Sequence, residues 1–275
     1  MAVAPLAWAD ASSVAARSRG CRVHPGHGAL AGRGGAGAAG ACRASGVAEQ
    51  HGAHLPLDTD TRIAAAVAER ACAGRDGVGL APAIAIGASG EHADFPGTLS
   101  IGHVALSTVL VELGRHASLH WRAMLLVNGH GGNVGAIGDA LGKLRAEGRD
   151  CHAWHAGVRP SMLAAAGLSL VPDAHAGRVE TSLMLALAPG DVRLDAAAPG
   201  DTRPLGEVMS DLRTRGVRRV SPNGVLGNPA RASAAEGKTL LDLIVADLAA
   251  TLDRLTAAAG DFALADGAAL PAQRP

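Results

Sequence analysis

Aromatic and charged residues are scarce in this sequence. Its 275 residues include two Phe, three Trp and no Tyr, and charged side chains make up 18%. Without aromatic platforms, the chain has little means to stack nucleobases or to cage quaternary amines. Lys plus Arg number 25 and Asp plus Glu number 25, so no net positive charge is left to neutralise a phosphate backbone. We therefore expect no nucleic-acid partner.

Long apolar runs and paired cysteines are absent as well. The clearest apolar run, MLLV at residues 124–127, is far shorter than the roughly 20 residues that span a bilayer. The N-terminus lacks the basic start and apolar core of a secretion signal. The four cysteines are widely spaced with no C-x-x-C pair, which favours reduced thiols over a disulfide framework or a zinc knuckle. These absences predict no membrane partner and a cytoplasmic location, and they leave His and carboxylates as the ligands of any metal site.

From residue 47 onward, short apolar runs alternate with amphipathic stretches, a pattern typical of an α/β domain. We predict one such domain over residues 47–259, between an atypical Gly-, Ala- and Arg-rich N-terminus (1–46) and a frayed C-terminal tail (260–275). The predicted strands are residues 79–86, 122–128 and 151–155. The predicted helices are residues 61–73, 101–118, 134–147, 180–188 and 237–259.

The first candidate site is EQHGAHLPLDTD, residues 49–60. In an extended segment Glu49 and His51 point to the same side because side chains alternate, and Asp60 can return to them after a Pro-containing bend. Such a mixed set of nitrogen and oxygen ligands suits zinc, iron or manganese. The alternative is a polar loop that only caps the next helix, a reading that applies most readily to His54 and Asp58.

The second candidate site is NGHGGN, residues 128–133, directly after a predicted buried strand. This order places His130 at the carboxyl end of a strand, where open α/β sheets bind their ligands. Glycines beside it allow the backbone and small ligands to approach closely. A phosphate-binding turn is the weaker alternative, because neither G-x-x-x-x-G-K-[ST] nor G-x-G-x-x-G is present.

The third candidate site is DAHAGRVETS, residues 173–182. His175 is a candidate general acid or base because imidazole titrates near neutral pH. Glu180 falls in the first turn of a predicted helix, where a favourable interaction with the helix dipole is the alternative explanation. A polar loop, residues 89–98, is expected to border the site. Because no G-x-S-x-G and no cysteine near these histidines is present, metal-assisted hydrolysis is the favoured chemistry.

The motifs EQHGAHLPLDTD, FPGT, NGHGGN and HAGRVETS, in this order and spacing, resemble the creatininase family of metal-dependent amidohydrolases. Three segments are most similar to the branch of that family found in mycofactocin biosynthesis, whose members are peptidases. These segments are GASGEHADFPGTLSIG, HAGRVETS and SPNGVLGNPARASAAEG. The resemblance implies a three-layer α/β/α sandwich with a mostly parallel sheet. It also implies a homo-oligomer, commonly a hexamer, and one or two divalent metal ions per subunit.

Carried over by motif, the resemblance implies that Glu49, Asp60 and His130 hold one ion. His51 and Asp60 would hold the second, with Asp60 bridging. Creatininase has a glutamate two residues after the histidine of its NGH motif, whereas this chain has Gly132. The remaining roles are then expected as follows: Glu180 supplies the missing ligand, His175 shuttles protons with Glu180 beside it, and His54, Glu91 and His92 bind substrate.

The implied reaction releases the C-terminal Val-Tyr-derived dipeptide from the modified precursor peptide by means of a metal-activated water. Two other functions stay open. One is hydrolysis of creatinine, or of a formamide in a flavin or deazaflavin pathway. The other is a non-catalytic or defective homologue.

The segment before Glu49 departs from the family. Family members have an apolar strand running directly into this glutamate, whereas this chain has GAGAAGACRASGVA, with no strand pattern. We therefore expect residues 1–46 to be frameshifted, wrongly started or disordered. A missing central strand would leave an unpaired edge and a weak hold on Glu49 and His51.

Overall fold

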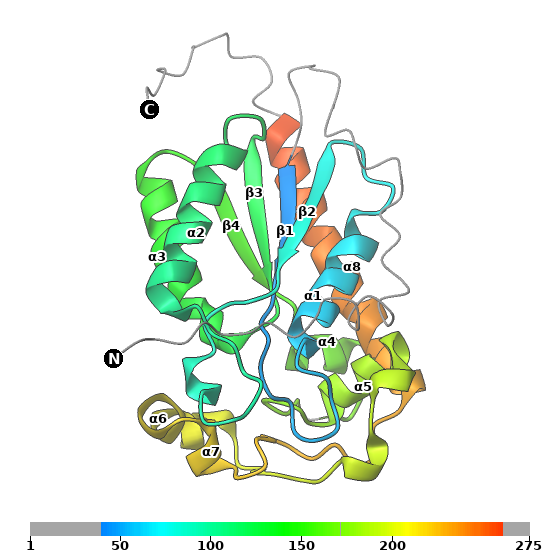
Figure 1. The fold of residues 1–275 in the computed structure, drawn as a ribbon. Helices are drawn as coiled ribbons and strands as arrows, with labels where there is room; N and C mark the ends of the chain where they lie inside the picture. Colours follow the sequence, from blue (N-terminus) through cyan, green and yellow to red (C-terminus); the bar gives the residue numbers. More distant parts are fainter. Residues whose placement is uncertain (1–39, 171, 261–275) are drawn as a thin grey trace, which may run out of the picture. The chain divides into compact units, whose positions relative to one another are not determined.

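The computed structural model describes residues 40–170 and 172–260, and Figure 1 shows their fold. The chain divides into two units, Met1–Gly35 and Ala36–Pro275, and every described residue belongs to the second. A sheet of four parallel strands in the order β2-β1-β3-β4 forms its centre. The strands are β1 (Gly40–Ser45), β2 (Val78–Ile84), β3 (Ala123–Asn128) and β4 (Asp150–His155).

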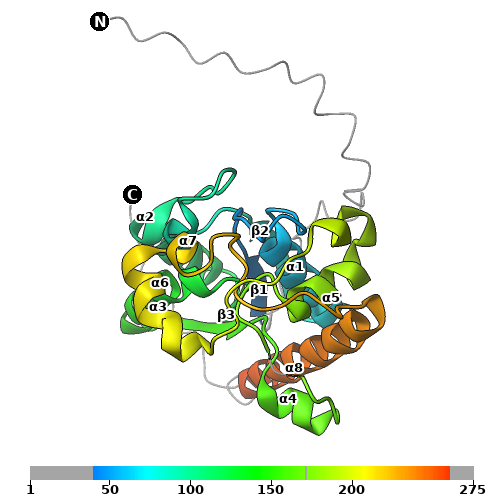
Figure 2. The same ribbon diagram turned by 90° about the horizontal axis from the view of Figure 1, so that it is seen from below.

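Helices cover both faces of this sheet, as the view from below shows (Figure 2). One face is covered by α1 (Thr59–Cys72) and α8 (Ala234–Gly260), and the other by α2 (Gly102–Ala117) and α3 (Val134–Ala146). The prediction of a three-layer α/β/α fold with a parallel sheet is confirmed. The remaining helices are α4 (Pro160–Ala165), α5 (Arg178–Leu187), α6 (Leu205–Arg215) and α7 (Val217–Val220), with 3-10 turns η1 (Gly90–His92), η2 (Gly131–Asn133), η3 (Pro189–Asp191) and η4 (Leu194–Ala196).

Strand β1 corrects the expectation that no strand precedes Glu49. Its residues, GACRAS, pair in parallel with β2 on one side and with β3 on the other, so β1 is a central strand. The strand pattern was invisible because small residues replace the usual branched ones. Cys42 and Ala44 are 0% and 2% exposed within the core. The other expectations for residues 1–39 and 261–275 lie outside the described residues.

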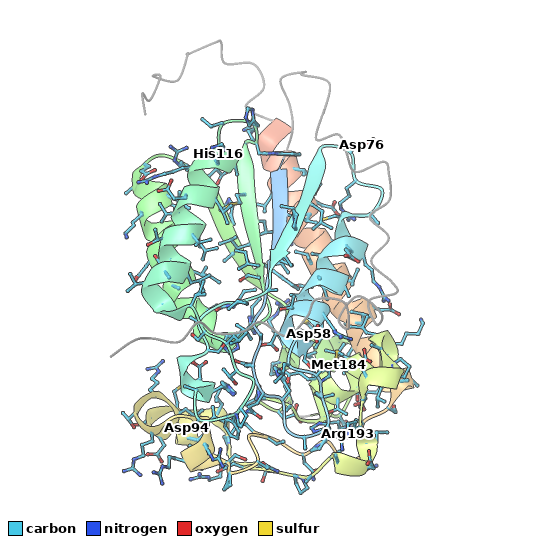
Figure 3. The ribbon with its side chains drawn as sticks, viewed as in Figure 1. Asp58, Asp76, Asp94, His116, Met184 and Arg193 are labelled. Atoms are coloured by element: carbon cyan, nitrogen blue, oxygen red, sulfur yellow. The ribbon has the colours of Figure 1, made fainter. Side chains whose placement is uncertain are left out.

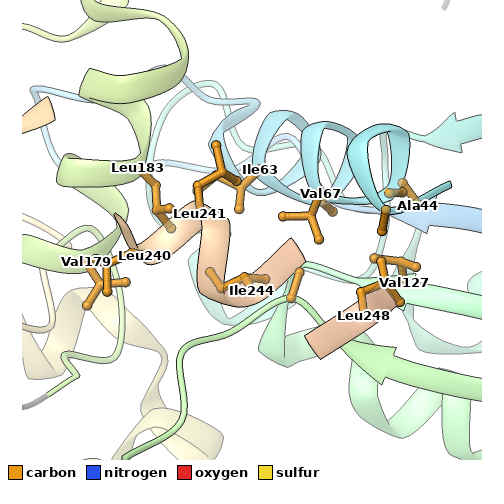
Figure 4. Close-up of a cluster of buried hydrophobic side chains, with 14 of the residues drawn as sticks. Ala44, Ile63, Val67, Val127, Val179, Leu183, Leu240, Leu241, Ile244 and Leu248 are labelled. Atoms are coloured by element: carbon orange, nitrogen blue, oxygen red, sulfur yellow. The ribbon is translucent and has the colours of Figure 1, made fainter. Parts of the chain in front are cut away.

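The larger core cluster fills the space between the sheet and helices α1, α5 and α8 (Figure 4). On α8, Leu240, Ile244 and Leu248 recur every four residues and are each 0% exposed, the spacing of a helix with one apolar face. They pack with Val67 of α1 and Val127 of β3 in the same cluster. In the same cluster α5 packs against α8 and α1, and α5 carries one of the candidate ligands.

Two further expectations concern compartment. Cys42, Cys72 and Cys151 are buried and form no disulfide, while Cys21 lies outside the described residues. In the part of the chain that the structure describes, no helix has the length and apolar character needed to cross a membrane.

Candidate metal centre

The motif loops meet at the carboxyl ends of the parallel strands (Figure 1). Residues 46–58 follow β1, η1 comes after β2, and η2 comes directly after β3. In Figure 3, Asp58 and Met184 lie toward this end of the molecule, whereas Asp76 and His116 lie at the opposite end of the sheet. Parallel pairing therefore gathers sequence-distant motifs at one edge, where α/β sheets bind ligands.

A first group of possible metal ligands consists of Glu49, Asp60 and His130, all buried. Nδ1 of His130 lies 3.1 Å from Oε1 of Glu49 and 3.1 Å from Oδ2 of Asp60. The turn that carries His130 is fixed by Asn128, whose side chain donates to the His130 carbonyl at 2.7 Å and accepts from its N–H at 3.2 Å. One imidazole nitrogen thus faces two carboxylate oxygens.

The other nitrogen of His130 determines which atom carries the proton. Nε2 lies 3.2 Å from the carbonyl oxygen of Ala88 and 3.1 Å from Oε1 of Glu91. A backbone carbonyl can only accept, so Nε2 is the donor and the neutral ring has its lone pair on Nδ1. That lone pair points at Glu49 and Asp60, an arrangement that calls for a cation between the three groups.

A second group consists of His51, Asp60 and Glu180. Nδ1 of His51 lies 3.1 Å from the carbonyl oxygen of Glu49, so by the same reasoning Nδ1 carries the proton and Nε2 the lone pair. Nε2 lies 3.0 Å from Oδ1 of Asp60 and 3.8 Å from Oε2 of Glu180. The two oxygens of Asp60 therefore face two different imidazoles, the arrangement a bridging carboxylate requires.

The charges of the cluster favour an added positive charge. Burial lowers the pKa of His51, but Asp60, Glu180 and Glu49 more than offset this effect and raise the pKa to about 10. Burial likewise opposes protonation of His130, yet Asp60, Glu49 and Glu91 hold its pKa well above the usual value. Burial raises the pKa of Glu180 to about 7, although His51 acts against it. The carboxylates therefore attract a proton or a metal cation.

The donor set fits a divalent metal. Glu49 is 0% exposed, and neither of its carboxylate oxygens has a hydrogen-bond partner among the described residues. A buried carboxylate without such partners is costly unless a cation compensates it. Imidazole and carboxylate ligands together suit zinc, iron and manganese.

His175 lies beside this cluster. Its Nε2 donates to the carbonyl oxygen of Gln50 at 2.8 Å, and its Nδ1 lies 3.7 Å from Oε1 of Glu49. Burial lowers its pKa well below the usual value, and the charges of His51 and His92 act in the same direction. The ring is therefore neutral, with a free lone pair on Nδ1.

The residues expected to bind substrate differ in their positions. Glu91 and His92 lie on η1 and join Glu49 in a further group of possible ligands. His54 is buried, and its Nε2 bonds to Oγ1 of Thr181 on α5 at 3.0 Å, so it links the first motif to a helix. It belongs to none of the four ligand groups found in the described residues.

Sequence reasoning missed several residues that shape the site. Asn133 is fully buried, and its Oδ1 accepts the N–H of Ala88 at 2.9 Å, which positions the acceptor of the His130 proton. Asp173 accepts the N–H groups of Arg178 and Val179 at the start of α5. The signal available in the sequence was the presence of these polar residues inside the quoted motifs. Polar side chains that become buried need hydrogen-bond partners, and those partners shape the site.

The fold and the site together define a class, an α/β/α protein whose parallel sheet carries paired His–carboxylate groups at its carboxyl edge. The chain belongs to the creatininase family, because a sequence model of that family, described as creatinine amidohydrolase, matches residues 37–252.

Curated relatives agree with this assignment. Mycofactocin precursor peptide peptidase of Mycolicibacterium smegmatis is 51% identical over 201 residues, 71% of this chain and 76% of that protein. The protein of the same name from Mycobacterium tuberculosis is 48% identical over 211 residues, 74% of this chain and 80% of that protein. Creatinine amidohydrolase of Pseudomonas putida is 31% identical over 230 residues, 74% of this chain and 85% of that protein.

Solved structures give the same fold. A crystal structure of creatinine amidohydrolase (creatininase) matches with a TM-score of 0.65 and 27% identity over 80% of this chain and 91% of that chain. A mutant creatininase of the Zn–Zn type matches with a TM-score of 0.64 and 27% identity over 78% of this chain and 89% of that chain. The predicted resemblance to the creatininase family is confirmed.

Proposed function

We propose that this protein is a metal-dependent peptidase of mycofactocin biosynthesis, which releases the C-terminal Val-Tyr-derived dipeptide from the modified precursor peptide. The observation that carries the proposal is the greater similarity of the chain to mycofactocin precursor peptide peptidases than to creatinine amidohydrolase. On this basis the protein is a hydrolase that acts on C–N bonds. Creatinine and formamide hydrolysis are outcomes that the test below must distinguish.

Glu49, Asp60 and His130 would hold one divalent ion, and His51, Asp60 and Glu180 would hold a second. Zinc, iron and manganese all fit these ligands. When bound, such an ion lowers the pKa of a coordinated water to about 7 and polarises the scissile carbonyl. The lone pairs on Nδ1 of His130 and Nε2 of His51 support this ligand set. The two carboxylate oxygens of Glu49, which have no hydrogen-bond partner among the described residues, support it as well.

His175 would move the proton in this reaction. Because its Nε2 donates to the Gln50 carbonyl, Nδ1 is the atom that takes up a proton and passes it to the departing amine nitrogen. Glu180 lies 3.8 Å from His51 and is held by the N–H of Ala176 at 2.6 Å, which supports a role as ligand and as neighbour of the proton transfer.

Glu91 and His92 are proposed to contact the substrate, since both border the ligand cluster from η1. The same role for His54 would need it to leave Thr181, its partner in the structure.

The test is cleavage of the modified precursor peptide by purified, metal-loaded protein, followed by mass spectrometry. We expect release of the dipeptide, with loss of activity and of the ion held by the first ligand group in His130→Ala. Metal content per chain and thermal unfolding followed by circular dichroism are measured beside it, so that loss of the site is separated from loss of folding. Turnover of creatinine or a formamide without peptide cleavage would contradict the proposal, and a folded protein with metal but no amide hydrolysis would indicate a defective homologue.

A homo-oligomer, commonly a hexamer in the family, and a cytoplasmic location belong to the same proposal. Val104 and Val134 lie near the N-terminal ends of neighbouring helices α2 and α3 and are 78% and 58% exposed. Exposed apolar side chains of this kind support a covering partner copy. Three buried cysteines without disulfides support a reducing compartment.

A further inference from the structure

Gln50 lies between the candidate ligands Glu49 and His51 and is 5% exposed. Its Oε1 accepts the N–H of Gly52 at 2.9 Å, and its Nε2 donates to the carbonyl oxygen of Gly224 at 3.1 Å. Since a backbone N–H only donates and a carbonyl only accepts, the side-chain amide has one orientation. Gly224 has a φ of +78°, and a side chain there would collide with this amide.

The fixed amide determines the proton position on His92. Nε2 of Gln50 lies 2.9 Å from Nδ1 of His92 and 3.3 Å from Nε2 of His175. Because Nε2 of His175 donates to the carbonyl oxygen of Gln50, it cannot accept, and the second hydrogen of the amide is left to Nδ1 of His92. Nδ1 of His92 must therefore accept, so the neutral ring carries its proton on Nε2. That N–H lies 3.6 Å from Oε1 of Glu49, beyond hydrogen-bonding distance, and faces the ligand cluster.

His92 and His175 thus face the ligand cluster with opposite hydrogen-bonding groups, a donor and an acceptor. Their ring centroids are 4.6 Å apart, and each approaches Glu49 with one nitrogen. His175 presents a lone pair on Nδ1, because its Nε2 donates to the backbone of Gln50. His92 presents an N–H, because its Nδ1 accepts from the side chain of the same residue.

We propose that Gln50 is a positioning residue that holds His92 as an N–H donor for the carbonyl oxygen of the scissile amide. The inference rests on the proposed amide hydrolysis. A donor fixed before reaction stabilises the negative charge that develops on that oxygen, without reorganisation when the charge appears. His175, next to it, is left to handle the proton of the leaving amine.

The proton positions are tested directly by solid-state ¹⁵N NMR of histidine-labelled, zinc-loaded protein, with His92→Gln used to assign the His92 signals. We expect a bare Nδ1 and a protonated Nε2 in the parent. In Gln50→Glu a carboxylate oxygen faces Nδ1 and can only accept, so the proton should move to Nδ1. The same His92 signals in both proteins would overturn the inference, whatever the substrate proves to be.

The donor role is tested by substitutions of His92 that differ in the retained group. His92→Gln keeps an N–H donor near the position of Nε2, whereas His92→Met has similar length and no donor. We expect His92→Met to lose about 10²-fold in kcat, as when one such donor is removed elsewhere, and His92→Gln to recover a large part of it. Equal rates for the two variants, at equal metal content, would overturn the inference.

One control variant and one comparison of outcomes separate this inference from the proposed function. His103→Gln changes an exposed histidine that pairs with Asp139 on α3 and should leave the rate unchanged. If the parent cleaves no modified peptide, the proposed function fails, and the NMR comparison still decides the role of Gln50.

Discussion

A single glycine leaves room for the carboxylate that faces Nε2 of His130. A Cβ at Gly132 would collide with Oε1 of Glu91 and with Nε2 of His130, and would lie 2.5 Å from the carbonyl oxygen of Ala88. Glu91 therefore occupies the space that a side chain at this position would need. In this chain the carboxylate beside the NGH turn comes from η1, which Gly132 permits.

We expect Gly132→Ala to weaken metal binding about 10- to 100-fold, the usual effect of disturbing a partner of a ligating histidine. The added methyl group must displace Glu91, the Ala88 carbonyl or the ring of His130, which loosens the tautomer that directs Nδ1 to the metal. Competition with a fluorescent zinc chelator measures the affinity.

The matched control is Gly142→Ala, where a Cβ meets nothing within 4 Å on helix α3. This variant should keep the parent's affinity and gain about 0.5–1 kcal/mol of stability, because alanine favours a helix interior over glycine. Equal affinities in the two variants would show that Glu91 does not orient His130.

The sequence pointed to residues that the structure brings together in two groups of possible ligands, but it did not point to the partners of these residues. Glu49, His51, Asp60 and His130 are the residue types that bind metals, and they lie in motifs whose order implied one edge of a sheet. Gln50 carried no such signal, because its function depends on which atoms surround its amide. Those atoms come from segments as distant as Gly224, and local spacing does not reveal them.

At the level of elements, the predictions succeeded where the apolar pattern was strong. β3 is buried at all six positions, and it was the clearest strand in the sequence. Helices α4, α6 and α7 were not predicted. α4 and α7 have six and four residues, too few to show a helical period, and α6 buries only Val208 and Leu212, so its apolar pattern is weak. β1 was missed because buried small residues give no alternating pattern.

The central position of β1 leads to a prediction about where the folded domain begins. Deleting residues 1–35 removes no strand, ligand or core residue of the described part of the chain, so we expect unchanged metal content and unfolding temperature. Deleting residues 1–45 also removes β1 and breaks its pairing with both β2 and β3. The free energy of unfolding of a typical domain is only about 5–15 kcal/mol, so we expect this second protein not to fold.

Circular dichroism during heating and metal analysis of both truncated proteins provide the measurement. A cooperative transition in the chain that lacks β1 would contradict the central position of this strand. Loss of folding in the shorter deletion would instead place part of the folded domain before residue 36.

For the molecule as a whole, the site joins segments that are distant in sequence. Glu49 lies in the segment between β1 and α1, Asp60 in the first turn of α1, His130 after β3, and Glu180 on α5. Without a cation, their carboxylates repel one another in a buried space. With a cation, the same groups tie the sheet to the helix layer, so metal binding and stability are coupled.

Removal of metal should therefore destabilise the parent protein. At a free metal concentration 100-fold above its dissociation constant, binding adds about 2.7 kcal/mol to the free energy of unfolding. For a domain of this size that corresponds to roughly 5–10 °C in the unfolding temperature, which calorimetry with and without a chelator would measure. Asp60→Ala should unfold at one temperature under both conditions, because Asp60 belongs to both ligand groups. If the parent binds metal and unfolds at the same temperature after chelation, the ion lies elsewhere and these residues do not hold it.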